Sequence, residues 1–255
     1  MYAIIAAGGK STPKDPLYPI LKGGLKAFLP IHGKPMVQWV LDTLAMANSV
    51  EGVVMIGPPA DSPVVFQKPL KIIESDLDLF GNLELGARTI RQIDPNQELA
   101  LFVSADLPAI TPEMVDWVAE QMQGKTHDLY YSVITRQVME ARYPASRRTY
   151  VQLKDVEACG GDVNGVRIGL LCEDHPLWQK IIASRKNPLK QASLLGFNTL
   201  INVFLHRYTL SQAEAAISKR LGVRGKVLVC PYAEVGMDVD KPFQLDIVRA
   251  DMLSR

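Results

Sequence analysis

Three short apolar runs mark the first half of the chain, at residues 2–6, 52–56 and 99–103. Segments whose apolar residues recur at helical spacing follow these runs, at residues 35–47, 82–92 and 112–122. Such alternation is typical of βαβ units, whose helices cover both faces of a parallel sheet. The pattern therefore predicts an α/β fold, in which Thr111 and Pro112 begin the third helix.

The second half of the chain does not continue this alternation of strands and helices. Strands are predicted at Leu129–Thr135, Thr149–Leu153, Val166–Leu171 and Lys226–Cys230. Residues 176–222 are mostly helical in pattern, and Asp238–Leu245 leads into a last helix. No repeat and no linker divides the chain, so we predict a single domain over residues 1–255 with a helical excursion at about 176–222.

An apolar cluster lies within this excursion. Its members are Leu194, Leu195, Phe197, Leu200, Ile201, Phe204 and Leu205. A core helix or the contact of a homodimer is the favoured interpretation, and a membrane-surface or lipid-substrate contact is the alternative.

Composition narrows the class of partner. Lysine and arginine total 28 against 27 acidic residues, and no long basic run offers a surface for nucleic acid. Cys159, Cys172 and Cys230 are isolated, which indicates reduced thiols in a cytoplasmic protein and not a disulfide or zinc framework. Neither a signal peptide nor a membrane span is expected, because no apolar run reaches about 18 residues and the start lacks a basic segment.

Two of the predicted strands end in residues suited to nucleotide chemistry. The first runs into the small residues Ala6-Ala-Gly-Gly9, and the third into Ser104, Ala105 and Asp106. The carboxyl ends of parallel strands meet at one edge of a sheet, where bare backbone can cradle phosphate and a carboxylate can bind a metal. The two segments therefore predict a nucleotide site at this edge.

Two common phosphate-binding motifs are excluded. Gly9-Lys10-Ser11 imitates the end of a P-loop, but Ile4 occupies the position of its first glycine, and prolines follow at 13, 16 and 19 where that motif requires a helix. A dinucleotide fingerprint is excluded as well, because no third glycine opens a helix after Gly8 and Gly9.

Five motifs, in order along the chain, resemble those of the MobA-like nucleotidyltransferases, which include molybdenum-cofactor guanylyltransferase and cytidylyl- and uridylyltransferases. They are Ala6-Ala-Gly-Gly9, Lys26 ahead of Leu29-Pro30, Gly33-Lys-Pro-Met36, Asp106-Leu-Pro108 with Thr111-Pro-Glu113, and Asp240-Lys-Pro-Phe-Gln-Leu245. Three further segments, Glu140-Ala-Arg142, Arg148-Thr-Tyr150 and Gly160-Gly161, resemble a group of stand-alone members. The resemblance implies a three-layer, mostly parallel sheet of the nucleotide-diphospho-sugar transferase (GT-A-like) type.

The resemblance also implies an activity. A nucleoside monophosphate would pass from a nucleoside triphosphate to a small phosphorylated acceptor, with release of pyrophosphate and with Mg²⁺ or Mn²⁺ as the cofactor. Lys26, Asp106 and Asp240 fall at the catalytic positions, and the two aspartates are the expected metal ligands. Asp238 is the rival of Asp240, because residues two apart on a strand share a face.

Two further sets of residues are assigned by the same resemblance. The nucleotide set comprises Ala6, Ala7, Gly8, Gly9, Lys10, Lys26, Asn82, Ser104 and Ala105. The acceptor set comprises Arg147, Arg148, Tyr150, Gly161 and Asp162. The planar fork of arginine suits a phosphate, and a solvated surface cluster is the alternative for Arg147 and Arg148.

The chain departs from the family pattern in two places. The family commonly has an arginine in its first loop, whereas here no arginine occurs before Arg88, and Lys10, Lys14 and Lys22 are the candidates to replace it. Asp162 stands where the group of stand-alone members usually has asparagine.

Two other functions therefore stay open. One is a glycosyltransferase that uses a nucleotide-sugar through Asp76-Leu-Asp78 or Asp238-Val-Asp240. The other is a nucleotide-binding regulator that has no catalytic activity.

Overall fold

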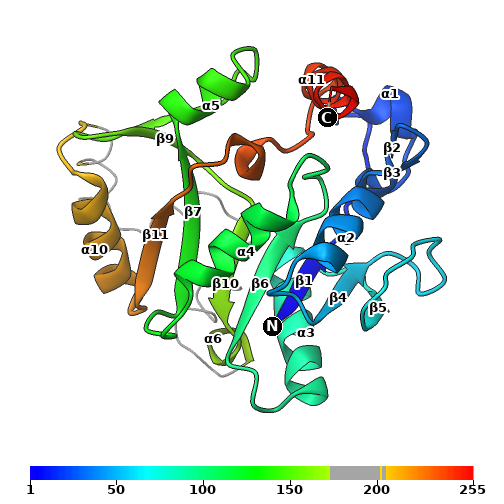
Figure 1. Cartoon of the computed structure of the whole chain (residues 1–255), viewed down its shortest axis with the longest axis horizontal. Coiled ribbons are helices and arrows are strands. Elements are labelled where there is room, and N and C mark those ends of the chain that lie inside the picture. The colour runs from blue at the N-terminus through cyan, green and yellow to red at the C-terminus, as the bar shows by residue number, and fades with distance from the viewer. Residues whose placement is uncertain (173–201, 203–204, 255) are drawn as a thin grey trace.

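The computed structural model describes residues 1–172, 202 and 205–254 (Figure 1). Most of the helical excursion expected at 176–222 lies outside the described residues, and so does the apolar cluster except for Leu205. Of this excursion, the described part contains helix α10 (Leu210–Leu221).

One mixed sheet of nine strands organises the described part of the chain. The strands are β1 (Tyr2–Ala6), β4 (Gly52–Gly57), β5 (Leu70–Glu74), β6 (Leu99–Ser104), β7 (Leu129–Thr135), β8 (Val151–Gln152), β9 (Glu157–Gly160), β10 (Val163–Arg167) and β11 (Gly225–Val229). Their order is β5-β4-β1-β6-β10-β7-β9-β8, and β11 lies beside β7. All except β9 and β10 run in one direction, which confirms the predicted mostly parallel α/β sheet.

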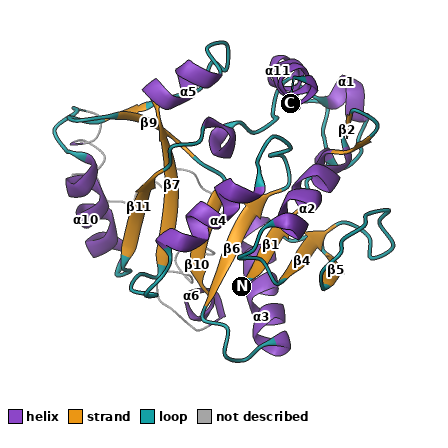
Figure 2. Ribbon diagram, in the orientation of Figure 1, coloured by secondary structure: helices purple, strands orange, loops and turns teal. Residues whose placement is uncertain are grey.

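Helices cover both faces of this sheet (Figure 2). The described α-helices besides α10 are α1 (Tyr18–Leu21), α2 (Met36–Met46), α3 (Leu79–Ile93), α4 (Pro112–Gln121), α5 (Arg136–Arg142), α6 (Ile168–Cys172) and α11 (Pro242–Leu253). Two 3₁₀ turns, η1 (Lys26–Phe28) and η2 (Ala233–Gly236), and a small hairpin of β2 (Pro30–Ile31) and β3 (Lys34–Pro35) complete the described elements.

Two hydrophobic cores follow from the alternation of side chains along the central strands. Ala3 and Ile5 of β1 pack in one core with α2, α4 and α11, whereas Ile4 packs in the other with α3 and α6. Residues on both faces of β1 are therefore apolar, as expected of a parallel strand covered on both sides. The arrangement is the predicted three-layer one.

The boundaries predicted for the first half agree with the structure to within a few residues. The predicted strand Val166–Leu171 is wrong in its second part, because β10 ends at Arg167 and α6 begins at Ile168. Ile168, Leu171 and Cys172 are buried at helical spacing against α3. A short apolar run does not distinguish a strand from a buried helical turn, which explains the error.

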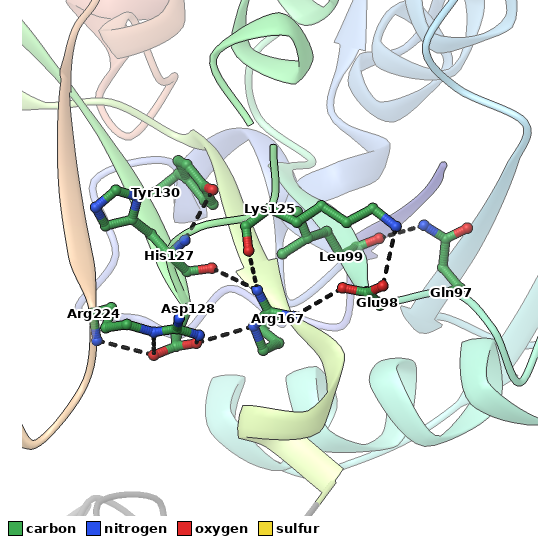
Figure 3. A network of polar contacts seen from close by, with 9 residues as sticks. All are labelled: Gln97, Glu98, Leu99, Lys125, His127, Asp128, Tyr130, Arg167 and Arg224. Carbon is green, nitrogen blue, oxygen red and sulfur yellow. Dashed lines mark hydrogen bonds and ion pairs between the residues drawn. The ribbon is translucent and has the colours of Figure 1, made fainter. Parts of the chain in front are cut away.

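A polar network fastens the sheet at the amino ends of β6 and β7, opposite the edge where the site lies (Figure 3). Arg167 donates to Asp128 at 3.0 Å and to Glu98 at 3.1 Å, and Arg224 donates to Asp128 at 2.7 Å. The hydrogen bonds from Arg224 outweigh burial and lower the pKa of Asp128 to about 2. The network thereby joins β6, β7, β10 and β11. Among the described helices, none has the length and apolar content to cross a membrane.

Candidate nucleotide and metal site

A cavity of about 340 Å³ lies at the carboxyl ends of β1 and β6, beside the start of α3. It is lined by Ala6, Ala7, Gly8, Gly9, Lys26, Ala27, Leu77, Asp78, Leu79, Asn82, Ser104, Ala105 and Asp106. The structure thus brings together every residue of the nucleotide set except Lys10. The Lys10 side chain lies outside the cavity, exposed, with its ammonium 3.3 Å from Asp76.

The two glycines of the first loop differ in their surroundings. A Cβ on Gly8 would lie 2.8 Å from the Cα of Gly57, so the loop crosses the end of β4 at a distance that only glycine permits. A Cβ on Gly9 would meet no atom within 4 Å. Gly8 is therefore required by packing, and Gly9 leaves its backbone open beside the cavity.

Helix α3 presents its amino end to the cavity, because Asp78 and Leu79 lie in the lining. The helix begins at Leu79, three residues before the predicted start, and the Asp78 carboxylate caps it by accepting the Gly81 amide at 3.0 Å. A helix amino end attracts phosphate through its free amides and its dipole. Sequence reasoning missed this part of the site, although Asp78 ahead of an apolar helical pattern was a readable cap signal.

Asn82 is buried and its side-chain amide is already hydrogen-bonded. The amide oxygen accepts the Ser75 hydroxyl at 2.7 Å, and the amide nitrogen donates to the Leu77 carbonyl at 3.3 Å. Asn82 therefore holds the loop of residues 75–77 against α3. In this structure it shapes the wall of the cavity through that loop.

Lys26 joins the two carboxylates predicted to bind metal. Its backbone amide donates to the Gly9 carbonyl at 2.8 Å, which places η1 at the first loop. Its ammonium donates to Asp106 at 2.5 Å and also to Asp240. Burial opposes the charged form, but the charges of Asp106 and Asp240 outweigh it and raise the pKa of Lys26.

The chain brings Asp106 and Asp240 together through its backbone as well. The Val239 amide donates to the Asp106 carbonyl at 3.1 Å, so the segment that carries Asp240 lies along the end of β6. Burial opposes the charged form of the Asp240 carboxylate, but hydrogen bonds from Asp238 and Lys26 outweigh burial and lower the pKa of Asp240.

One oxygen of Asp106 fits a metal. Its Oδ1 atom is buried and has no hydrogen-bond partner, and a buried carboxylate oxygen in that condition is costly unless a ligand satisfies it. Within the described residues, no group of three or more His, Cys, Asp or Glu side chains could enclose an ion. Two carboxylates completed by substrate phosphates and water are, however, the usual protein share of a Mg²⁺ site.

Asp238, the predicted rival of Asp240, occupies a different environment. Its carboxylate is buried and forms an ion pair with Arg148, whose guanidinium also donates to the Gly160 carbonyl at 3.4 Å. Asp240 instead is half-exposed and faces Lys26. Asp238 thus pairs with Arg148 and also hydrogen-bonds to Asp240, whereas Asp240 is the aspartate that lies beside Lys26 and Asp106.

The acceptor set is only partly brought together. Asp162 forms a carboxylate cluster with Asp106, Asp238 and Asp240. Burial and the charge of Asp106 raise the pKa of Asp162 to about 7. Arg147 is exposed, with its guanidinium 5.3 Å from the ring of Phe243. The Tyr150 ring lies 4.9 Å from the Arg136 guanidinium, against α5. A Cβ on Gly161 would lie 2.8 Å from the Cδ1 atom of Ile134, so a larger residue would require the Ile134 side chain to shift.

Comparison with known proteins identifies the class. A family model described as the MobA-like NTP transferase domain matches residues 3–186, and the chain belongs to this family. A solved structure of a hypothetical transferase from Thermus thermophilus is 32% identical, with a TM-score of 0.81, over 96% of this chain and 98% of that one.

More distant similarity extends to proteins of named activity. CMP:2-keto-3-deoxy-manno-octonic acid synthetase, solved with CTP, shares 17% identity at a TM-score of 0.61 over 100% of this chain and 98% of that one. The two solved structures confirm the predicted nucleotide-diphospho-sugar transferase type of fold. Glucose-1-phosphate thymidylyltransferase of Mycobacterium tuberculosis is 43% identical over 63 residues, which are 25% of this chain and 20% of that protein.

Proposed function

We propose that this chain transfers a nucleoside monophosphate from a nucleoside triphosphate to a small phosphorylated acceptor and releases pyrophosphate. The observation that carries the proposal is the Lys26 ammonium between Asp106 and Asp240, at a cavity with walls of loop backbone and an α-helix amino end. Phosphoryl-type transfer requires mainly positioning and charge neutralisation, and this arrangement suits both.

The reaction balances without a catalytic base. An oxygen of the ionised acceptor phosphate attacks the α-phosphorus, and a new bond forms between that phosphorus and that oxygen. The bond from the α-phosphorus to the bridging oxygen of pyrophosphate breaks, and pyrophosphate leaves with the electron pair.

The chain's own groups take three roles in this proposal. Backbone amides at residues 7–9 and the amino end of α3 bind the triphosphate oxygens. The Lys26 ammonium neutralises charge that develops on the leaving pyrophosphate, and its raised pKa keeps it protonated at neutral pH. The acceptor would bind on the side of Asp162, which directly precedes β10.

Asp106 and Asp240 would hold Mg²⁺ or Mn²⁺. When bound, the ion supplies charge neutralisation at the reacting phosphates. The orphaned Oδ1 atom of Asp106 supports this assignment, because it is an acceptor without a donor in an otherwise hydrogen-bonded site.

The activities named for similar proteins support the same class of reaction. The matched thymidylyltransferase is named for glucose 1-phosphate, and the matched synthetase was solved with CTP. Because the matched segment spans 20% of the thymidylyltransferase, its base and its acceptor are starting points for a screen of this chain.

The decisive experiment measures pyrophosphate released from each of the four nucleoside triphosphates against a panel of sugar, polyol and pterin phosphates, with Mg²⁺. We expect one combination to turn over and the variant Asp106→Ala to lack turnover while it keeps the wild-type circular dichroism spectrum. Release of a nucleoside diphosphate from nucleotide-sugars would identify a glycosyltransferase instead. A thermal shift with triphosphate in the absence of any turnover would identify a nucleotide-binding regulator.

A further inference from the structure

Arg142, from the Glu140-Ala-Arg142 motif, has a set of contacts that the candidate site does not use. It ends α5, and its guanidinium contacts the carboxyl-terminal part of the chain, from η2 to α11. Its Nε atom donates to Glu234 at 3.1 Å, and its Nη2 atom donates to Asp251. The neighbouring Tyr143 hydroxyl donates to the other carboxylate oxygen of Asp251 at 2.9 Å.

The two carboxylates bracket the segment that carries Asp240. Glu234 lies in η2 before this segment, and Asp251 lies on α11 after it. Their side chains are 10% and 5% exposed, so each needs a partner for its charge. The planar fork of arginine can reach two carboxylates from two elements at once, which a lysine ammonium matches less well.

The opposite side of the segment is fixed by the sheet. The Asp162 amide donates to the Val235 carbonyl at 2.8 Å, and the Val239 amide donates to the Asp106 carbonyl at 3.1 Å. Arg148 adds an ion pair to Asp238 within the same segment. The segment of residues 235–241 is therefore held from the sheet by backbone hydrogen bonds and from the side of α5 by arginines.

We propose that Arg142 is a positioning residue that holds Asp240 beside Asp106, where the two carboxylates would hold the metal. The Glu140-Ala-Arg142 and Arg148-Thr-Tyr150 segments then serve the metal-binding end of the site and not the recognition of the acceptor. This inference rests on the proposed function, because that proposal makes Asp240 the second metal ligand.

The experiment compares hydrogen–deuterium exchange in the wild type, Arg142→Ala, Arg142→Lys and Arg136→Ala. Arg136 is a matched control, since it lies on the same helix, is about as exposed and also pairs with two carboxylates, Glu140 and Glu157. We expect Arg142→Ala to speed exchange over residues 235–245 by about tenfold or more, with β1 and β4 unchanged. Arg142→Lys should recover part of the protection, and Arg136→Ala should match the wild type.

Kinetics distinguish positioning from acceptor binding. Once a substrate pair is known, Arg142→Ala should lower kcat and raise the Mg²⁺ concentration for half-maximal rate by about tenfold, with an unchanged KM for the acceptor. Should Arg142→Ala fail to fold, Tyr143→Phe removes only the contact to Asp251 and is expected to give the same changes in smaller measure.

Two outcomes overturn the inference. One is a raised acceptor KM with unaltered exchange, which would make Arg142 an acceptor ligand. The other is equal exchange in Arg136→Ala and Arg142→Ala, which would leave Arg142 no particular role. The exchange result does not depend on turnover, so failure of the proposed reaction and failure of this inference can be told apart.

Discussion

The variant Arg148→Ala tests most directly what the basic segment before Gly160 does. The sequence assigns Arg148 to the acceptor, but in the structure its guanidinium is 17% exposed and paired with Asp238, whose side chain is 12% exposed. Removal of one partner from a buried ion pair costs about 3–5 kcal/mol, because the other charge remains buried. Burial also raises the pKa of Asp238, and a neutral carboxyl that has lost Arg148 costs less than a carboxylate, so we expect the lower end of this range at neutral pH.

The assay is equilibrium unfolding by denaturant, supported by calorimetry. A loss of about 3 kcal/mol corresponds to a fall in Tm of roughly 6–12 °C for a chain of this size. The double variant Arg148→Ala with Asp238→Asn should be more stable than the sum of the single changes by about 1–3 kcal/mol, since the carboxylate is then replaced by a neutral amide. Wild-type stability in Arg148→Ala, together with an acceptor KM raised at least tenfold, would refute this reasoning and support the assignment made from the sequence.

Three further predictions concern the metal, the opposite edge of the sheet and the first loop. Asp240→Asn should raise the Mg²⁺ requirement in pyrophosphate release more than Asp238→Asn does, and the reverse ranking would make Asp238 the ligand. Asp128→Asn should lower the free energy of unfolding by about 1 kcal/mol at pH 7, after allowance for solvent screening. Because the folded pKa of Asp128 is depressed to about 2, that stability is present above pH 4 and is lost between about pH 4 and 2. Unfolding of wild type and variant should therefore converge near pH 2. Gly8→Ala should lower the free energy of unfolding by about 1–3 kcal/mol, because the added Cβ would contact Gly57. Gly9→Ala should unfold like the wild type, because its added Cβ meets no atom. Equal losses in the two variants would contradict the packing argument.

The part of the site that follows from parallel-strand geometry could be predicted from the sequence. Ala6–Gly9 and Asp106 directly follow apolar runs, and strands of one direction deliver such residues to one edge, where the structure has them lining one cavity. The predicted start of α3 is three residues late, because the apolar pattern alone does not mark the cap at Asp78. In each of these cases the residues that carry the signal lie within a few positions of one another, so the local sequence is enough to predict the feature.

Contacts between distant segments could not be read in the same way. Asp238 lies 90 residues after Arg148, and nothing in either local sequence indicates that the two charges neutralise each other. The sequence therefore predicts that Arg148 is available to bind phosphate, whereas in the structure its guanidinium is paired with the buried Asp238. Lys26 and Asp240, 214 residues apart, were expected in one site only because the family resemblance implies a catalytic role for both, and their pairing was not expected.

The balance of charge at the site bears on the missing loop arginine. Asp106, Asp162, Asp238 and Asp240 meet Lys26 and Arg148 at the described end of the sheet, which leaves two negative charges in excess when all are ionised. A triphosphate would add more negative charge to this cluster, and the exposed Lys10 is paired with Asp76 outside the cavity. In the proposed reaction, a divalent cation between Asp106 and Asp240 would offset this excess of negative charge. On the proposed function, the metal would supply neutralisation that a loop arginine would otherwise share, so the carboxylate cluster and the absent arginine are consistent with each other.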